Sequence, residues 1–107
     1  MFGYAIWKVR GHSMAPALLD GSFVLLRTRV NVTKLTNGCR VIIKHPQFGD
    51  MVKTVAYVDS KGVIWCRGEN QQSISMAQIG AIKKEQIIGR VIASFAPPVK
   101  TPAINGR

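Results

Sequence analysis

Short apolar segments alternate along the chain with polar, turn-forming residues, at intervals typical of β-strands. Turn signals such as Asn37-Gly38 and His45-Pro46 separate these segments. The pattern predicts an all-β domain, a compact folded-over sheet or partial barrel, with one short helical turn within residues 78–86. The segments expected to form strands are 4–10, 22–30, 39–44, 51–58, 63–67 and 87–95.

Two of these segments predict more than a strand. Residues 23–26 show no polar alternation, which predicts that both faces of that strand are covered. Gly89 interrupts the last segment and is expected to mark a β-bulge. Because no linker or repeat divides the chain, we expect one domain over residues 1–98 and a mobile tail over residues 99–107.

The charge of the chain is strongly positive. Fifteen Lys and Arg against five Asp and Glu give a net charge of +10, and 47% of the residues are hydrophobic. The basic residues are scattered, without an arginine-rich arm or a zinc-finger spacing, so nucleic acid is not the expected partner. Peripheral contact with an anionic membrane surface remains compatible with this charge.

The sequence argues against several classes of segment and site. The first apolar run ends at Lys8, too early for a signal peptide, and no run is long enough to span a membrane, so we expect a cytoplasmic protein. Cys39 and Cys66 lie in apolar segments. They can form one disulfide or remain two free thiols, and the sequence does not decide between these alternatives. The two histidines are isolated, so neither a metal nor another cofactor is expected.

The turn 11–16 carries the first candidate for chemistry. Ser13 follows a predicted strand and can present its hydroxyl to a cleft as a nucleophile, although the same composition suits an ordinary turn. Ser13 needs a base, and His12 is a poor one because adjacent residues on an extended chain point to opposite faces. His45 with Asp50 leaves a Ser-His-Asp arrangement open.

Lys53 is the second candidate. Strand alternation places it on one face with Met51, Val55 and Tyr57, in an otherwise apolar row. Burial disfavours a charged ammonium and lowers the pKa of a lysine, and a neutral lysine amine can act as general base toward a serine. The alternative is a lysine at a strand edge or surface, with its ammonium in solvent.

Five short motifs occur in one order over residues 9–91, and their combination is more specific than any one of them. Together they resemble the signal peptidase I (S26) family, in which a serine and a lysine form the catalytic pair. The motifs are Gly11-His12-Ser13-Met14-Ala15-Pro16 with Gly21, Gly38-x-Arg40-Val41-Ile42-Ile43, Met51-Val52-Lys53-Thr54-Val55, Gly68-Glu69-Asn70 with Ser73-x-Ser75, and Ile87-Ile88-Gly89-Arg90-Val91.

The resemblance implies a role for individual residues. Ser13 would be the nucleophile, with its backbone N–H in the oxyanion hole, and Lys53 would be the general base. Ser73 matches the serine that orients the lysine. Gly11, Met14 and Pro16 would line the substrate groove. No metal or cofactor is implied.

The chain also departs from the pattern of the S26 family. Thr54 stands where that family usually has arginine, and Ser75-Met76-Ala77 stands in place of Asp-Ser-Arg. The Asp-Arg pair that braces the site in that family is therefore expected to be missing. Glu69 is a conservative replacement for aspartate.

The compact chain is most similar to the small maturation protease associated with nickel-type superoxide dismutase. This predicts a serine endopeptidase that removes a leader or propeptide from another protein, which is its expected partner. LexA-like self-cleaving peptidases share the Ser-Lys core but carry a DNA-binding domain and cleavable linker upstream, which we do not expect here. The alternative is a non-catalytic module that binds an extended peptide or nucleic acid on a degenerate peptidase fold.

Overall fold

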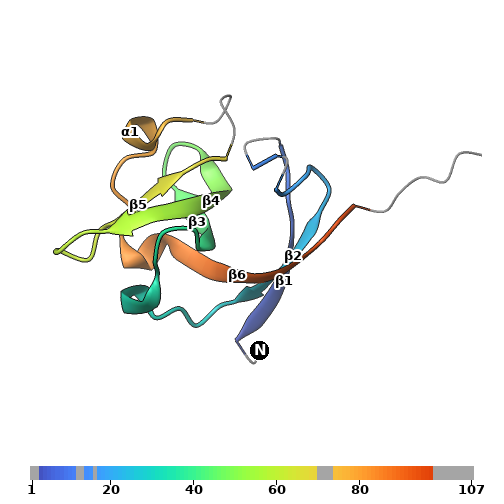
Figure 1. The fold of residues 1–107 in the computed structure, drawn as a ribbon, viewed down its shortest axis with the longest axis horizontal. Coiled ribbons are helices and arrows are strands. Elements are labelled where there is room, and N and C mark those ends of the chain that lie inside the picture. The colour runs from blue at the N-terminus through green and yellow to red at the C-terminus, as the bar shows by residue number, and fades with distance from the viewer. Residues whose placement is uncertain (1–2, 12–13, 16, 70–73, 98–107) are drawn as a thin grey trace, which may run out of the picture.

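A computed structural model describes residues 3–11, 14–15, 17–69 and 74–97, which form one folded-over antiparallel sheet (Figure 1). Neighbouring strands follow the order β1-β2-β6-β3-β4-β5, and every pair is antiparallel. The ends of the sheet do not pair with each other, so it is not closed, and the predicted all-β fold is confirmed. The strands are β1 (Tyr4–Lys8), β2 (Phe23–Arg27), β3 (Arg40–His45), β4 (Gly49–Val58), β5 (Ile64–Arg67) and β6 (Ile87–Phe95).

The helical segments are short, and their extent differs from the prediction. Residues 78–86 do not form one turn: α1 (Met76–Ile79) begins earlier, and η2 (Lys84–Gln86) is separate. Ser75 causes the early start, because its hydroxyl accepts the N–H of Gln78 and caps the first turn. A further 3₁₀ turn, η1 (Val32–Lys34), follows β2. None of the helices in the described ranges is long or apolar enough to cross a membrane.

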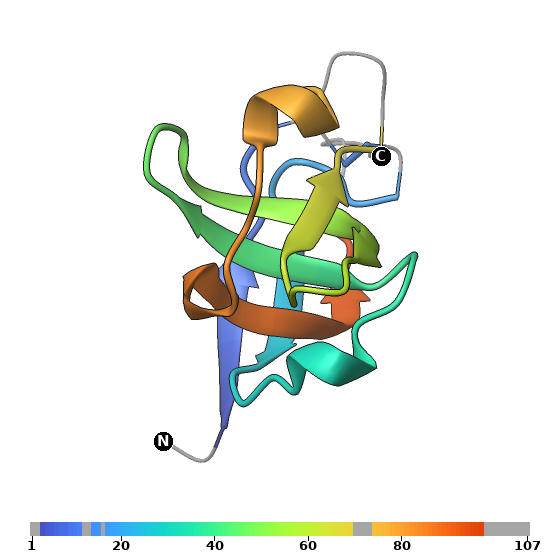
Figure 2. The same ribbon diagram turned by 90° about the vertical axis from the view of Figure 1, so that its left-hand side faces the viewer.

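Strand β6 folds the sheet over. It pairs with β2 along one part of its length and with β3 along the other. Ile42 pairs with Gly89 and Ile43 with Ile87, so the β6 residue between them is unpaired and forms the predicted bulge. A Cβ at Gly89 would lie 3.1 Å from the carbonyl oxygen of Arg27, so a larger residue would push β2 slightly away and glycine favours the close approach. Figure 2 shows the two halves of the sheet crossing at β6.

Two hydrophobic cores lie on opposite faces of β3. Ile42 belongs to one core, with Val24 and Leu26 of β2, whereas its neighbours Val41 and Ile43 belong to the other, with residues of β4, β5 and α1. Alternation along an extended strand explains this division, because successive side chains point to opposite faces. Strand β3 therefore joins both cores.

The expectation that both faces of β2 are covered is wrong. Val24 and Leu26 are fully buried, but Phe23 is 37% exposed and Leu25 is only half-buried. The reason lies in the layers: no described element packs over the outer face of β1, β2 and the adjoining part of β6. That face also exposes Tyr4 and Ile6 of β1.

Candidate active site

A cleft of about 690 Å³ lies between two strand edges. One wall is β1 and the residues after it, from Ile6 to Gly11. The other wall is the β3–β4 turn and the first part of β4, from Asp50 to Lys53, together with Phe48. Among the described strands, β3 alone pairs with this part of β4, because the pairing with β5 begins at Thr54. The cleft therefore separates two strand edges that make no ladder bonds to each other.

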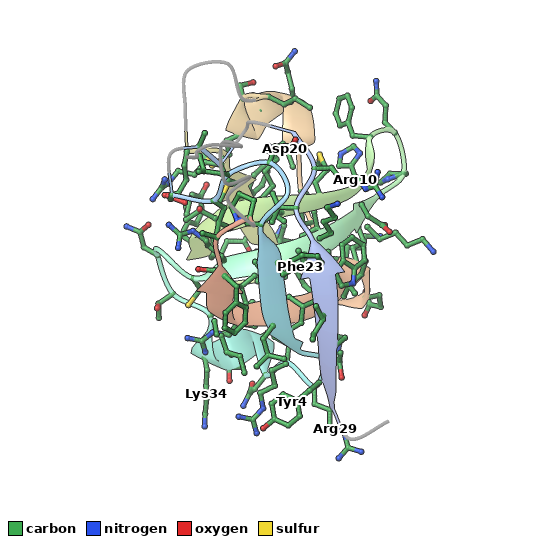
Figure 3. All side chains as sticks on the ribbon, turned by 90° about the vertical axis from the view of Figure 1, so that its right-hand side faces the viewer. Tyr4, Arg10, Asp20, Phe23, Arg29 and Lys34 are labelled. Carbon is green, nitrogen blue, oxygen red and sulfur yellow. The ribbon has the colours of Figure 1, made fainter. Side chains whose placement is uncertain are left out.

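The turn after β1 is anchored at both of its ends. Val9 and Ser22 share a backbone hydrogen bond of 2.7 Å, and the Gly11 N–H donates to the carboxylate of Asp20 at 2.8 Å. Gly11 has a φ of 89°, which favours glycine at this position. Arg10 and Asp20 lie close to this turn at the upper end of Figure 3.

Met14 both fills the core and lines the cleft. Its side chain is 2% exposed, within the core that contains Leu18 and Ile42, and its carbonyl accepts the Leu18 N–H at 2.8 Å. Met14 therefore has a packing role in addition to the expected place in the substrate groove. Gly11, the other described residue of the expected substrate groove, lines the cleft as well.

Three residues assigned from the sequence lie outside the described residues: Ser13, Pro16 and Ser73. Their neighbours are described. Met14, which follows Ser13, and Ile74, which follows Ser73, both line the cleft. Lys53 lines the same cleft, so segments from three distant parts of the sequence meet there.

Lys53 is buried, which decides between the two alternatives that the sequence left open. Its side chain is 1% exposed, and on the same face Val41 lies opposite it and Val55 lies two residues further along β4. Desolvation lowers the pKa of Lys53 from the usual value for lysine. Within the described ranges no carboxylate forms an ion pair with it. The fourth member of the predicted row, Tyr57, is 49% exposed because the β4–β5 register shifts between Val55 and Tyr57.

Cys66 lies beside Lys53 but does not balance its charge. This residue pairs with Val55 across β4 and β5 and is fully buried. Burial raises the pKa of its thiol to about 11, although the nearby Lys53 opposes that shift. At neutral pH the thiol is therefore uncharged. Cys39 is also a free thiol, so the two cysteines are not paired with each other.

His45 does not serve as a base, which argues against the Ser-His-Asp alternative. The ring is buried, and its Nε2 lies 2.8 Å from the carbonyl oxygen of Ile79, to which it donates. Its Nδ1 accepts the backbone N–H groups of Gln47 and Phe48 at 3.0 and 3.1 Å. With both nitrogens bound to backbone, the ring shapes the turn and ties it to α1.

A polar cluster lies on the opposite face of β4 from Lys53. The Glu69 carboxylate accepts hydrogen bonds from the Arg40 guanidinium at 2.8 and 3.3 Å and from the Thr54 hydroxyl at 2.9 Å. That hydroxyl also lies 4.0 Å from the sulfur of Met14. We call Arg40, Thr54 and Glu69 the brace. It connects β3, β4 and the end of β5 to the residue that follows Ser13.

Residues 3–92 match the peptidase S24-like family. The chain belongs to this family. All six strands begin within the match. Ser13, Lys53 and both walls of the cleft lie within it. Membership supports a peptidase-type hydrolase. This assignment is broader than the signal peptidase I family, which the match does not specify. A search of the curated proteins finds no match.

The sequence of this S24-like domain did not predict the brace. Thr54 stood out only as the loss of an arginine, yet the structure supplies a guanidinium from Arg40 on the adjacent strand. The signal was the β3–β4 register, in which Arg40 lies opposite Thr54. Hydrogen bonds from Arg40 are the main reason that the pKa of Glu69 is lowered.

The fourth motif of this S24-like domain, which contains Ser75, has a structural role in the described residues. Ser75, which stands in place of an aspartate, caps α1, and its hydroxyl and backbone N–H both contact Gln78. In the described ranges no three His, Cys, Asp or Glu side chains gather into a metal site.

Proposed function

We propose that this chain is a serine endopeptidase in which Ser13 is the nucleophile, Lys53 the general base and Ser73 the residue that orients the lysine amine. The observation that carries the proposal is Lys53. It is a buried amine with a lowered pKa, at a cleft that is also lined by the residues next to both serines. Perturbed ionisable groups in clefts are typical of catalytic sites.

The proposed reaction needs Lys53 in its neutral form. The amine takes the proton of the Ser13 hydroxyl while the oxygen attacks the scissile carbonyl and forms a tetrahedral oxyanion. The resulting ammonium returns the proton to the leaving amine, and an acyl-enzyme remains. Water then attacks the ester with the same lysine as base, which releases the acid product and restores Ser13.

The walls of the cleft suit an extended peptide. Both β1 and the first part of β4 present strand edges there, so a peptide strand between them can form backbone hydrogen bonds on two sides. Ile6, Trp7 and Met51 supply apolar contacts along the cleft. This favours an unfolded segment, such as a leader, over a folded substrate.

The narrower substrate rests on the resemblance described above. We propose a leader-bearing protein as substrate and partner, with the precursor of a nickel-type superoxide dismutase as the first one to test. By the same resemblance, a small side chain is expected before the cut. A cytoplasmic location, with peripheral membrane contact through basic charge, is part of this proposal.

The test is cleavage of leader-bearing precursors, followed by N-terminal sequencing and intact mass of the products and of the chain itself. Ser13→Ala and Lys53→Met should abolish the cut. Lys44→Met is the matched control, because Lys44 is an exposed lysine on the adjacent strand. Full activity of either Ser13→Ala or Lys53→Met would refute the mechanism.

The same experiment identifies a non-catalytic module, which the open cleft also suits. Such a module would retain a peptide equally well with Ser13 or Ala at position 13 and would release no product. A precursor that is bound but never cut by the unmodified chain would therefore replace the proposed activity with peptide capture.

A further inference from the structure

A second, smaller pocket of about 170 Å³ lies at the other end of β1 and β2 from the cleft. Arg27 is the last residue of β2, and it pairs with Tyr4, the first residue of β1. The cleft lies at the opposite end of β1, where residues from Ile6 to Gly11 form its wall. Figure 3 shows Arg29 and Lys34 at the lower end of the molecule, away from Arg10 and Asp20. The residues that line the pocket are Arg27, Arg29, Val30, Asn31, Lys34 and Arg90.

Four cationic side chains converge there from three parts of the fold. Arg27 and Arg90 are direct cross-strand partners on β2 and β6. Arg29 follows β2, and its side chain packs over Gly3, where an added Cβ would lie 3.7 Å away. Lys34 comes from η1. The strand register and the short η1 turn therefore bring these charges together.

Asn31 adds a neutral donor to the pocket. Its side-chain oxygen accepts the N–H and the hydroxyl of Thr33 at 3.1 and 2.6 Å, which caps η1. With the oxygen used, the group of Asn31 that is left for a ligand is its amide nitrogen, a hydrogen-bond donor. Every polar side chain that lines the pocket can thus donate hydrogen bonds.

Among the residues that the structure describes, no Asp or Glu lines this pocket. In the described part of the chain, the ion pair found is that between Arg40 and Glu69, and none of the four pocket cations takes part in it. Like charges that converge without an acid repel one another, and a bound anion would relieve that repulsion. The arrangement differs from scattered surface charge, in which each cation faces water alone.

We propose that this pocket binds a phosphate-type oxyanion. Arginine guanidinium groups match tetrahedral oxyanions through paired N–H donors, and three of them line the pocket. The volume is below the roughly 300–1,000 Å³ of pockets for drug-sized ligands, which suits a single anionic group. Two sources supply this chemistry: free phosphate, or the headgroup of an anionic phospholipid.

The surface around the pocket also suits contact with a lipid membrane. Tyr4, opposite Arg27, is 48% exposed, and Ile6 on the same face of β1 is 69% exposed. Strands β1, β2 and β6 contain no acidic residue. An apolar face beside a cationic pocket could meet an anionic bilayer, whereas free phosphate would use the pocket alone. The pocket and the cleft share no lining residue, so oxyanion binding in the pocket stands or falls independently of the peptidase mechanism.

The first arm is a phosphate titration followed by NMR, with chloride at the same ionic strength as the reference. The Nε–Hε signals of Arg27, Arg29 and Arg90 should shift and saturate with phosphate but not with chloride. The variant with both Arg27→Gln and Arg29→Gln should bind phosphate at least tenfold more weakly. The matched control, Lys61→Gln with Lys84→Gln, removes the same charge elsewhere and should change the affinity less than twofold.

The second arm measures sedimentation with vesicles of phosphatidylcholine alone or with added phosphatidylglycerol. Binding to the anionic vesicles that the arginine variant loses and the lysine control keeps identifies the headgroup source. Saturable phosphate binding without vesicle binding identifies free phosphate. The proposal is overturned if neither probe binds, or if the arginine variant and the lysine control weaken binding equally, which would indicate only general charge.

Discussion

Lys53 and Thr54 are neighbours on β4, yet the two faces of the strand treat charge in opposite ways. Lys53 is 1% exposed and has no carboxylate partner in the described residues. Thr54 is 2% exposed and donates to Glu69, whose charge is matched by Arg40. One face holds an amine that is pushed toward its neutral form, and the other holds a stable ion pair.

This difference is what the proposed role of Lys53 as a base requires. A carboxylate close to Lys53 would stabilise the ammonium and raise the pKa of the lysine. Alternation along β4 places Glu69 beside Thr54, away from that amine. We therefore interpret the brace as structural support and the Lys53 face as the reactive side, and the following changes test that division.

The largest effect is expected from Lys53→Met. If the lysine is the base, kcat/KM falls at least about 1,000-fold. The free energy of unfolding should nevertheless rise by about 1–3 kcal/mol at neutral pH, because an apolar side chain of similar length replaces a buried, uncompensated ammonium. Urea unfolding and precursor cleavage measure the two quantities. A loss of stability that accompanies the loss of activity would contradict the assignment.

Disruption of the brace should give the opposite result. Glu69→Gln removes the charge that Arg40 faces in a partly buried position, and we expect a loss of about 1.5–3 kcal/mol of stability. Activity should fall less than about 100-fold at a temperature where the variant is folded. Arg40→Lys keeps the charge but loses the second hydrogen bond, so its stability should be intermediate. If Glu69→Gln were as stable as the parent chain, the brace would have no supporting role.

The residues on the two faces of β4 should change the free energy of unfolding in two different pH ranges. The pKa of Glu69 is lowered in the fold, so its stabilisation is present above about pH 4.3 and is lost as the pH falls through the lower, folded value. The pKa of Lys53 is also lowered, so the unfolded chain binds more protons between the folded value and about 10.4, and stability rises with pH there.

A comparison with Lys53→Met isolates the lysine contribution. Cys66 works against it, because its raised pKa makes stability fall between about pH 8.5 and the folded value of about 11. The variant retains Cys66, so the difference in stability between parent and variant should narrow as the pH rises. A difference that stays constant from neutral to alkaline pH would show that Lys53 does not lose its proton early.

The smallest effect is expected from Thr54→Val. This change deletes the hydroxyl that donates to Glu69 and leaves the Arg40 pair in place, so the loss of stability should be about 1 kcal/mol. Thr54→Ser keeps the hydroxyl and should recover most of that loss. Thermal unfolding distinguishes the two variants, and equal losses would indicate packing against Met14 as the main role of Thr54.

The sequence predicted what depends on local pattern. Six strands and the bulge at Gly89 follow from alternation and from glycine placement, and alternation also placed Lys53 in a largely apolar row. Whether that lysine is buried or reaches solvent was left open, and the structure shows that it is buried. The brace could not be predicted, since it depends on which β3 residue lies opposite Thr54, and that register is set by a turn whose shape involves the buried ring of His45. The open outer face of β2 was mispredicted because an apolar run does not reveal whether a second layer exists.

The titration of the Lys53 amine tests the central claim most directly. In a chain labelled with ¹³C at the lysine ε carbons, the Lys53 signal is the one that Lys53→Met lacks. We predict that this signal titrates below the ordinary lysine value of about 10.4, and that kcat/KM rises over the same pH range. A Lys53 signal that titrates at or above that ordinary value would contradict the assignment of Lys53 as a general base.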